Sequence, residues 1–171
     1  MSPLILSGVL GAIVAWRLPS TWDLPAFLVL AGLTVPLVIA DLTERRLPNR
    51  LTLPAYPALG VTLSVAAVAD GRGWDLARAV LAGAALIVGY GLLHALRPAS
   101  LGAGDVKLSG ALGIALGWIS WDTVLNGAIA GYVIGAIVGA TLLVRGERGR
   151  AFAFGPAMLA GAWLAILSAN A

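Results

Sequence analysis

The sequence predicts an all-α fold, a polytopic bundle of about seven transmembrane helices. Of its 171 residues, 60% are hydrophobic and only 11% are charged, whereas a soluble domain carries about 25% charged residues. The apolar residues form blocks that recur from one end of the chain to the other, separated by short connections rich in charge, proline or glycine. These observations indicate a single integral membrane domain over residues 1–171.

Each apolar block is assigned one helix, because a span needs roughly 20 apolar residues to cross a hydrocarbon core about 30 Å thick. The first block lacks a preceding basic region and is followed by equally apolar blocks, so we expect a retained helix and not a cleaved signal peptide. The first and fifth blocks are short, which leaves open six full spans plus one shallow segment. In chain order, the predicted helices cover residues 3–17, 24–40, 52–69, 77–96, 106–120, 123–144 and 151–169.

Glycine marks one face of the sixth predicted helix. Gly127, Gly131, Gly135 and Gly139 recur at a spacing of four. This spacing places them in a stripe that allows another helix to approach closely. We therefore expect the stripe to be a packing face.

The basic residues predict the orientation of the bundle. With seven alternating spans, the connections near 41–51, 97–107 and 145–150 share one side, and they hold 8 of the 11 basic residues. Short cytoplasmic loops are enriched in lysine and arginine, so we expect this side and the amino terminus to be cytoplasmic. Topology also explains the basic charge without nucleic acid as a partner. The 8 residues are Arg45, Arg46, Arg50, Arg97, Lys107, Arg145, Arg148 and Arg150, and the other side holds Arg17, Arg72 and Arg78.

Tryptophan supports the same topology. Amphipathic indole rings favour the headgroup region of a bilayer. Only Trp163 of the 6 tryptophans falls within a predicted span and away from its ends. The others fall at or near the ends assigned to the non-cytoplasmic face, and they are Trp16, Trp22, Trp74, Trp118 and Trp121.

Two of the 8 acidic residues need a specific explanation, because the other six lie in predicted outer loops or beside arginines. Asp41 directly follows the apolar run LTVPLVIA, and Asp105 directly precedes VKLSGALGIALGW. Both are therefore expected at cytoplasmic helix ends, although 64 residues (105 − 41) separate them. An ionisable side chain at a membrane edge more often faces a bundle interior or a wet cavity than lipid. The two acids could therefore meet.

The sequence around each acid indicates a fixed position. Gly102 and Gly104 precede Asp105 and permit positive φ and close approach to another segment. A proline-asparagine pair breaks the helix after Asp41 and turns the chain back into the membrane. Two ordinary explanations stay open at this point. Asp105 could cap the next helix, and each acid could pair with a neighbouring arginine or lysine.

Two aspartates at helix breaks on one side also suit a catalytic dyad. One carboxylate would activate water, and the other, kept protonated, would polarise a carbonyl. Such a dyad needs no cofactor. The chain has no cysteine and a single histidine, His94, so thiolate sites and a histidine cluster for a metal are excluded. These residues indicate aspartyl hydrolysis at a membrane interface, but they do not select a substrate.

Three ordered motifs resemble the type IV prepilin peptidases, which are membrane aspartyl proteases of the GxGD type. The first is D-x5-LPNRLTLP, which starts at Asp41. The second is GAGDVKL, from Gly102 to Leu108, and the third is FGPAMLAGAWLA, which starts at Phe154. A lone GxGD would be a weak signal, but all three motifs match in order and spacing, and the resemblance extends over essentially the whole chain.

The resemblance implies that Asp41 and Asp105 are the catalytic pair of an aspartic endopeptidase in the inner (plasma) membrane. Its partners would be the lipid bilayer and prepilin-like precursors, whose leader is cut on the cytoplasmic side just before a hydrophobic helix. Gly102 and Gly104 would shape the active-site loop. Residues that would support the substrate or the structure are Lys107, Pro48, Asn49, Phe154, Gly155 and Pro156.

One departure from the family pattern concerns cysteine. Longer bacterial members carry an amino-terminal cytoplasmic region with cysteine pairs that bind zinc, and this region is associated with methylation of the new amino terminus. This chain has no cysteine. It resembles the short, peptidase-only members, so we expect no metal, no cofactor and no methyltransferase activity.

Three alternatives make different predictions. The presenilin and signal peptide peptidase group shares GxGD but has Tyr-Asp at its first acid, where this chain has Ala40 before Asp41. A small membrane transporter would carry acids deep within its spans, paired across repeats, and the sequence shows neither. A non-enzymatic subunit of a pilus or secretion assembly would tolerate the loss of either aspartate.

Overall fold

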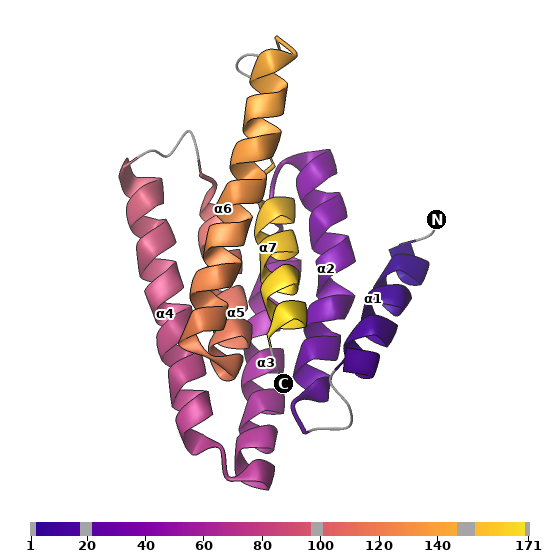
Figure 1. Ribbon diagram of the computed structural model, residues 1–171, viewed down its shortest axis with the longest axis vertical. Helices are drawn as coiled ribbons and strands as arrows, with labels where there is room; N and C mark the ends of the chain where they lie inside the picture. The colour runs from indigo at the N-terminus through magenta and orange to yellow at the C-terminus, as the bar shows by residue number, and fades with distance from the viewer. Residues whose placement is uncertain (1–2, 18–21, 97–100, 147–152, 170–171) are drawn as a thin grey trace.

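The chain forms a bundle of helices in the computed structural model, which describes residues 3–17, 22–96, 101–146 and 153–169. No strand occurs in these ranges, which confirms the predicted all-α fold. The predicted helices agree with the observed ones within a few residues at each end, although positions 151–152 lie outside the described residues. The helices are α1 (Pro3–Arg17), α2 (Leu24–Glu44), α3 (Asn49–Asp70), α4 (Gly73–Leu96), α5 (Ala103–Ile119), α6 (Trp121–Val144) and α7 (Gly155–Ser168) (Figure 1).

Four helices in the described part of the chain are long and apolar enough to cross a membrane: α2, α3, α4 and α6. They have 21 to 24 residues, which matches the length that a bilayer core requires. The other three are shorter, with 15 residues in α1, 17 in α5 and 14 in α7. That these three also cross the membrane stays a prediction.

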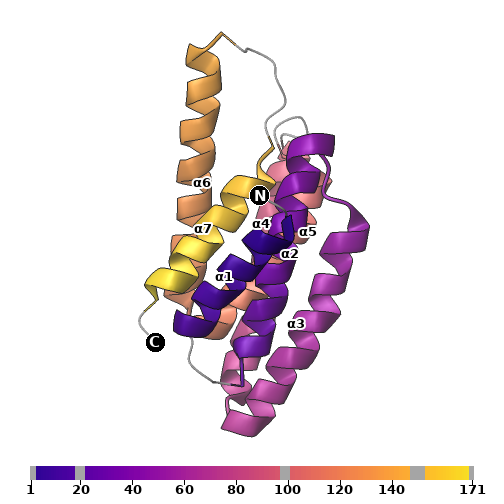
Figure 2. The same ribbon diagram turned by 90° about the vertical axis from the view of Figure 1, so that its right-hand side faces the viewer.

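The short helix α5 is enclosed by other helices. Eleven of its 17 residues are buried, and they lie on all sides of the helix, from Asp105 to Trp118. It packs against α3, α4, α6 and α7 and touches α2, and both views show it within the bundle (Figures 1 and 2). Protein therefore surrounds α5, so its length does not have to match the thickness of the lipid.

Glycine residues allow two helix pairs to pack closely, α4 with α5 and α6 with α7. A Cβ atom on Gly113 of α5 would lie 2.7 Å from the Ala82 carbonyl oxygen of α4. A Cβ atom on Gly161 of α7 would lie 2.7 Å from the Gly127 carbonyl oxygen of α6. Since such distances are too short for a real Cβ contact, these positions require glycine.

The predicted glycine stripe on α6 is a packing face over most of its length. Gly127, Gly131 and Gly135 are buried, as predicted. At Gly139 the prediction is wrong, because a Cβ atom there would have nothing within 4 Å. The reason is that α7 begins only at Gly155, whereas α6 continues beyond the other helices (Figure 1).

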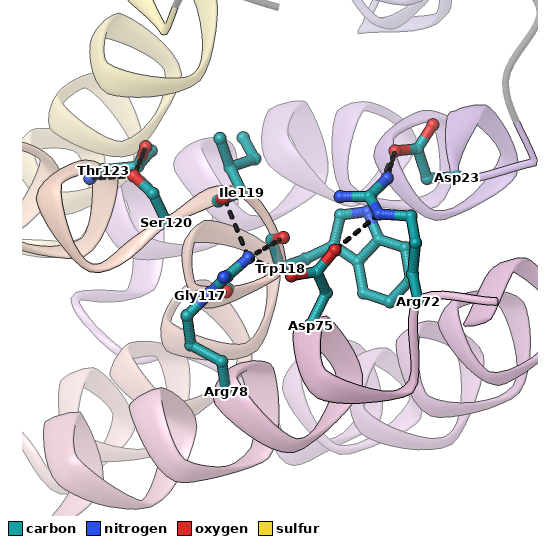
Figure 3. Close-up of polar contacts among 9 residues, drawn as sticks. All are labelled: Asp23, Arg72, Asp75, Arg78, Gly117, Trp118, Ile119, Ser120 and Thr123. Carbon is teal, nitrogen blue, oxygen red and sulfur yellow. Dashed lines mark hydrogen bonds and ion pairs between the residues drawn. The ribbon is translucent and has the colours of Figure 1, made fainter. Parts of the chain in front are cut away.

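At the end of the bundle where α5 finishes, Arg78 caps the free carbonyl groups of that helix (Figure 3). Its guanidinium donates to the carbonyl oxygens of Gly117, Trp118 and Ile119 at 2.6, 2.7 and 2.9 Å. It also forms an ion pair with Asp75 at 2.8 Å. The last carbonyls of a helix have no partner within the helix and carry partial negative charge, so a cation is favoured here.

Trp118 lies at the same end of the bundle, and with Asp23, Arg72, Asp75 and Arg78 it forms what we call the polar end cluster. This position corrects the predicted place of Trp118 in the headgroup region. Its ring is fully buried, its Nε1 donates to Asp23 at 2.9 Å, and the Arg72 guanidinium lies 4.5 Å from the ring centroid. The indole is amphipathic, but this protein satisfies its N–H with a carboxylate instead of a lipid headgroup. The other tryptophans predicted at this face are exposed, and they are Trp16, Trp22, Trp74 and Trp121.

Trp163 is buried in α7, as its predicted place within a span requires, and its Nε1 donates to the hydroxyl of Thr34 at 2.9 Å.

Replacing Arg78 with methionine removes these donors and leaves the α5 carbonyls unsatisfied. We expect the free energy of unfolding to fall by roughly 2–4 kcal/mol, because a hydrogen bond to a charged group contributes about 1.5–3 kcal/mol and neighbouring bonds are not additive. Denaturation in detergent, followed by circular dichroism, measures the change. Arg50→Met is the matched control, since Arg50 is exposed at the start of α3. Equal losses in both variants would contradict a specific role for Arg78.

A second prediction concerns the α6–α7 contact. Gly161→Ala should destabilise the protein by about 1–3 kcal/mol, because the new methyl group meets the backbone of α6 and the helices must separate. Gly139→Ala should change the stability by less than about 1 kcal/mol, since its Cβ atom would meet nothing within 4 Å. Thermal unfolding of both variants in the same detergent tests the difference, and a loss of similar size at Gly139 would count against it.

Candidate active site

Asp41 lies in the last turn of α2, at the end of a helix as predicted. The helix continues through Glu44 and stops at Arg45, whose φ of 50° is left-handed and whose N–H donates to the Asp41 carbonyl oxygen at 3.0 Å. The predicted boundary at residue 40 is therefore wrong, because a charged residue can continue a helix where its side chain points into protein. The Asp41 side chain does so, and the residue is only 5% exposed.

Asp105 is the third residue of α5 and only 7% exposed. Its Oδ2 accepts a hydrogen bond from the N–H of Gly102 at 2.9 Å. The cap position is occupied by Gly102, so the alternative in which Asp105 is the cap residue is wrong, although the carboxylate still satisfies a backbone donor at this helix start. The first turn of a helix also favours negative charge.

Gly104 is needed for space, and neither of the two glycines before Asp105 has positive φ. Gly102 has a φ of −75°, and in the described residues only Gly71 and Gly146 among the glycines have positive φ. A Cβ atom on Gly104 would lie 2.9 Å from the Cβ of Leu47. The start of α5 thus touches the connection between α2 and α3, which confirms the predicted close approach.

The carboxylate of Asp41 is held by the first residue of α7. Gly155 donates its backbone N–H to Asp41 Oδ2 at 2.9 Å, across 114 positions of sequence. A Cβ atom on Gly155 would lie 2.7 Å from the same oxygen, so a side chain at this position would displace the Asp41 carboxylate. Gly155, which was expected only to support the site, thereby contacts one of the two acids directly.

Asp41 and Asp105 line one pocket with a volume of about 400 Å³. It lies where α2 ends and α5 begins, and the two carboxyl groups are close enough to interact electrostatically. The structure therefore brings together the two acids that the sequence singled out. The pocket is lined by Asp41, Arg45, Arg46, Leu47, Gly102, Ala103, Gly104 and Asp105.

The two arginines on the pocket wall do not neutralise these acids. Arg45 and Arg46 are exposed, and the ion pairs within the described ranges involve Asp23 and Asp75 at the opposite end of the bundle. The alternative in which each acid pairs with a neighbouring cation is therefore not observed. Arg45 and Arg46 would instead interact with a molecule that enters the pocket.

Lys107 and Asn49 form a structural link beside the pocket. Lys107 Nζ donates to Asn49 Oδ1 at 2.8 Å and ties α5 to the start of α3. Pro48 occupies the position before α3, and its carbonyl oxygen accepts from the N–H of Leu51 at 2.9 Å. None of these residues is among those that line the pocket, so the support expected from them is indirect.

The start of α7 contains the remaining predicted residues. Phe154 precedes the helix, and Pro156 lies in its first turn, where a missing backbone N–H costs nothing.

His94, to which the sequence assigned no role, has its Nδ1 2.7 Å from the Leu101 carbonyl oxygen and so links the end of α4 to the segment before α5.

One residue that the sequence analysis did not single out is Leu47. It is 7% exposed, lines the pocket and touches Gly104. Its place in the LPN motif was the signal that could have identified it.

Within the described ranges, no group of three or more His, Cys, Asp or Glu side chains gathers, and the expectation of a metal-free site stays a prediction. Chemically, the arrangement offers two carboxyl groups that can hold a water molecule and exchange its proton.

Comparison with known proteins matches this chain to one family. The model of the type IV leader peptidase family matches residues 28–144, which include both aspartates. The "Prepilin leader peptidase/N-methyltransferase" of Neisseria gonorrhoeae is 33% identical over 97% of this chain and 56% of its own length. The protein of the same name from Aeromonas salmonicida (strain A449) is 30% identical over 95% of this chain and 56% of its own length.

The chain thus spans little more than half the length of these curated relatives. No solved structure matches it significantly. The family match covers well over half of the chain and includes the four helices that are long and apolar enough to cross a membrane, in part or in full. The chain belongs to the type IV leader peptidase family, as a multi-pass membrane protein.

Proposed function

We propose that the chain is an aspartic endopeptidase that cleaves the leader peptide of prepilin-like precursors at the cytoplasmic face of the inner membrane. The observation that carries this proposal is the placement of Asp41 and Asp105, two buried carboxyl groups from separate helices on one pocket. Membership of the type IV leader peptidase family supports it. The whole chain would act as a single integral membrane domain.

Each aspartate has one oxygen engaged and one available. Among the described residues, the hydrogen bonds to these carboxyls come from Gly155 to Asp41 and from Gly102 to Asp105, and both reach Oδ2. Oδ1 of each carboxyl is then the atom offered to water and substrate. Because the backbone N–H groups hold both carboxyls in place, the pair needs no reorganisation when a peptide enters.

In the proposed reaction, one ionised aspartate accepts a proton from water while the water oxygen attacks the scissile carbonyl carbon. The other, protonated aspartate donates its proton to the carbonyl oxygen, which gives a neutral tetrahedral intermediate. The intermediate collapses when the leaving amide nitrogen takes a proton from the first aspartate and the C–N bond breaks. The second aspartate regains its proton from the intermediate, so the pair finishes in its starting state.

The charge of the bundle ends supports the proposed orientation. Arg45 and Arg46 line the pocket, and Lys107, Arg50 and Arg145 lie near the helix ends that face the same end of the bundle. The amino terminus of α1 lies toward this same end (Figure 1). An excess of lysine and arginine marks the cytoplasmic side, which would place the pocket and the amino terminus there. A precursor whose hydrophobic helix lies in the bilayer would present its leader at this depth.

Neither a metal nor a cofactor is part of the proposed mechanism, and nucleic acid is not a proposed partner.

The central prediction is that Asp41→Asn and Asp105→Asn each abolish cleavage. An asparagine cannot take the proton from water or donate an acidic proton, so either loss should reduce the rate by about 10⁴-fold or more. The measurement is cleavage of a co-expressed prepilin-like precursor in membranes, at matched protein levels.

Asp70→Asn is the matched control, because Asp70 is an exposed acid at the far end of α3. Full activity in either Asp41→Asn or Asp105→Asn would refute the dyad and favour a transporter or a non-enzymatic assembly subunit.

A further prediction concerns the space between Leu47 and Gly104. Gly104→Ala should lower the cleavage rate by about 10- to 100-fold, because the new methyl group displaces the pocket wall beside Asp105 and small misplacements of catalytic groups are costly. Gly60→Ala should keep wild-type activity, since a Cβ atom there meets nothing within 4 Å. The same cleavage assay compares the two, and an active Gly104→Ala enzyme would show that the close contact is not required.

A further inference from the structure

Three aromatic rings meet near the proposed catalytic pair, two from helices and one from the residue that precedes α7. They belong to Tyr90 of α4, Tyr132 of α6 and Phe154, the residue before α7, and we call them the aromatic cluster. Tyr132 stacks on Tyr90 with ring centroids 5.4 Å apart. It also contacts Phe154 at 5.5 Å, and the third pair, Tyr90 and Phe154, is 6.4 Å apart. Tyr132 therefore has the shortest contacts to both other rings.

The start of α7 has no polar side-chain cap on its cap residue. Helix starts are commonly fixed by a serine, threonine, aspartate or asparagine whose side chain accepts from the backbone. Here the cap residue is Phe154, and its side chain makes no capping hydrogen bond. Ring contacts of the distances seen here have preferred geometries and add about 0.5–1.5 kcal/mol per pair. The cluster can thus fix the position of Phe154.

The position of Phe154 matters because its neighbour holds a proposed catalytic group. Gly155 follows it directly and donates its N–H to Asp41 Oδ2 at 2.9 Å. Any shift of Phe154 moves this N–H and the carboxylate that it binds. The phenol of Tyr90, in the same cluster, also interacts electrostatically with Asp105.

We propose that Tyr132 is a positioning residue of the peptidase. Its ring holds Phe154 against Tyr90, and this contact keeps the Gly155 N–H on the Asp41 carboxylate. Stacking and edge contacts involve the ring, so we assign the positioning to the ring and not to the hydroxyl, which interacts with that of Tyr90. This role rests on the function proposed above, but its structural part can be measured without catalysis.

The kinetic test compares Tyr132→Leu with Tyr132→Phe in purified enzyme, using a prepilin-like precursor in detergent. Tyr132→Leu should lower kcat by at least about tenfold with KM nearly unchanged, since a misplaced catalytic group affects the chemical step more than binding. Tyr132→Phe keeps the ring and should have the kcat of the wild-type enzyme. Trp121→Leu is the matched control, because it removes a ring of similar exposure, 46% against 40% for Tyr132, from the first residue of α6, whereas Tyr132 lies in the middle of that helix.

The structural test reads the Gly155 N–H directly. The chain has 3 phenylalanines, and only Phe154 is followed by glycine. Labelling phenylalanine with ¹³C at its carbonyl and glycine with ¹⁵N therefore isolates one amide signal, that of Gly155, in a carbonyl-edited NMR spectrum. We expect this amide to exchange with D₂O at least about tenfold faster in Tyr132→Leu than in wild type, because its hydrogen bond opens more often. Tyr132→Phe and Trp121→Leu should leave it unchanged.

The two tests distinguish a failure of the positioning role from a failure of the proposed function. If wild-type protein cleaves and Tyr132→Leu keeps full kcat with an unchanged Gly155 signal, Tyr132 has no positioning role and the proposed function stands. If Tyr132→Leu raises KM alone, or Tyr132→Phe is as impaired as Tyr132→Leu, positioning through the ring is also overturned. If wild-type protein cleaves no precursor, the proposed function fails, and the Gly155 signal alone decides whether Tyr132 holds the start of α7.

Discussion

A carboxylate at the edge of a membrane must be given hydrogen-bond donors, and the arrangement around the pocket follows from this constraint. An unpaired charge in an apolar environment is far less stable than one in water. Among the residues that the structure describes, side-chain cations do not supply the donors. Backbone N–H groups do, from Gly155 to Asp41 and from Gly102 to Asp105. Backbone donors at helix starts are available only if those starts are brought to the acids, so α2, α5 and α7 must converge at one end.

Convergence of three helix ends requires close packing along the rest of the bundle. Glycine provides it where α4 meets α5 and where α6 meets α7, since a Cβ atom on Gly113 or Gly161 would overlap the neighbouring backbone. Arg78 and the surrounding polar end cluster hold the far end of α5. The enclosed helix is thereby fixed at both ends, with a cation on its carbonyl end and Asp105 in its first turn.

The same architecture separates two kinds of charge. At the far end, Asp23, Arg72, Asp75 and Arg78 neutralise one another in a packed cluster. At the pocket, two aspartates and two arginines share a cavity, and none of the ion pairs in the described part of the chain joins them. Charges that are already paired contribute to stability, whereas charges held apart can act on a substrate. This contrast distinguishes the pocket from an ordinary polar patch and agrees with membership of the leader peptidase family.

The sequence by itself determined the helical class, the approximate helix positions and the two unusual acids, because apolar length and charge placement are limited by the bilayer. It also marked Gly155 through the FGP motif, without indicating what its N–H binds. Only the tertiary structure decided that Asp41 lies inside α2, that Leu47 meets Gly104 and that Trp118 is buried beside Asp23. These features depend on the depth and rotation at which helices pack. Close contacts between distant residues set that register, and the apolar pattern of a single helix does not encode it.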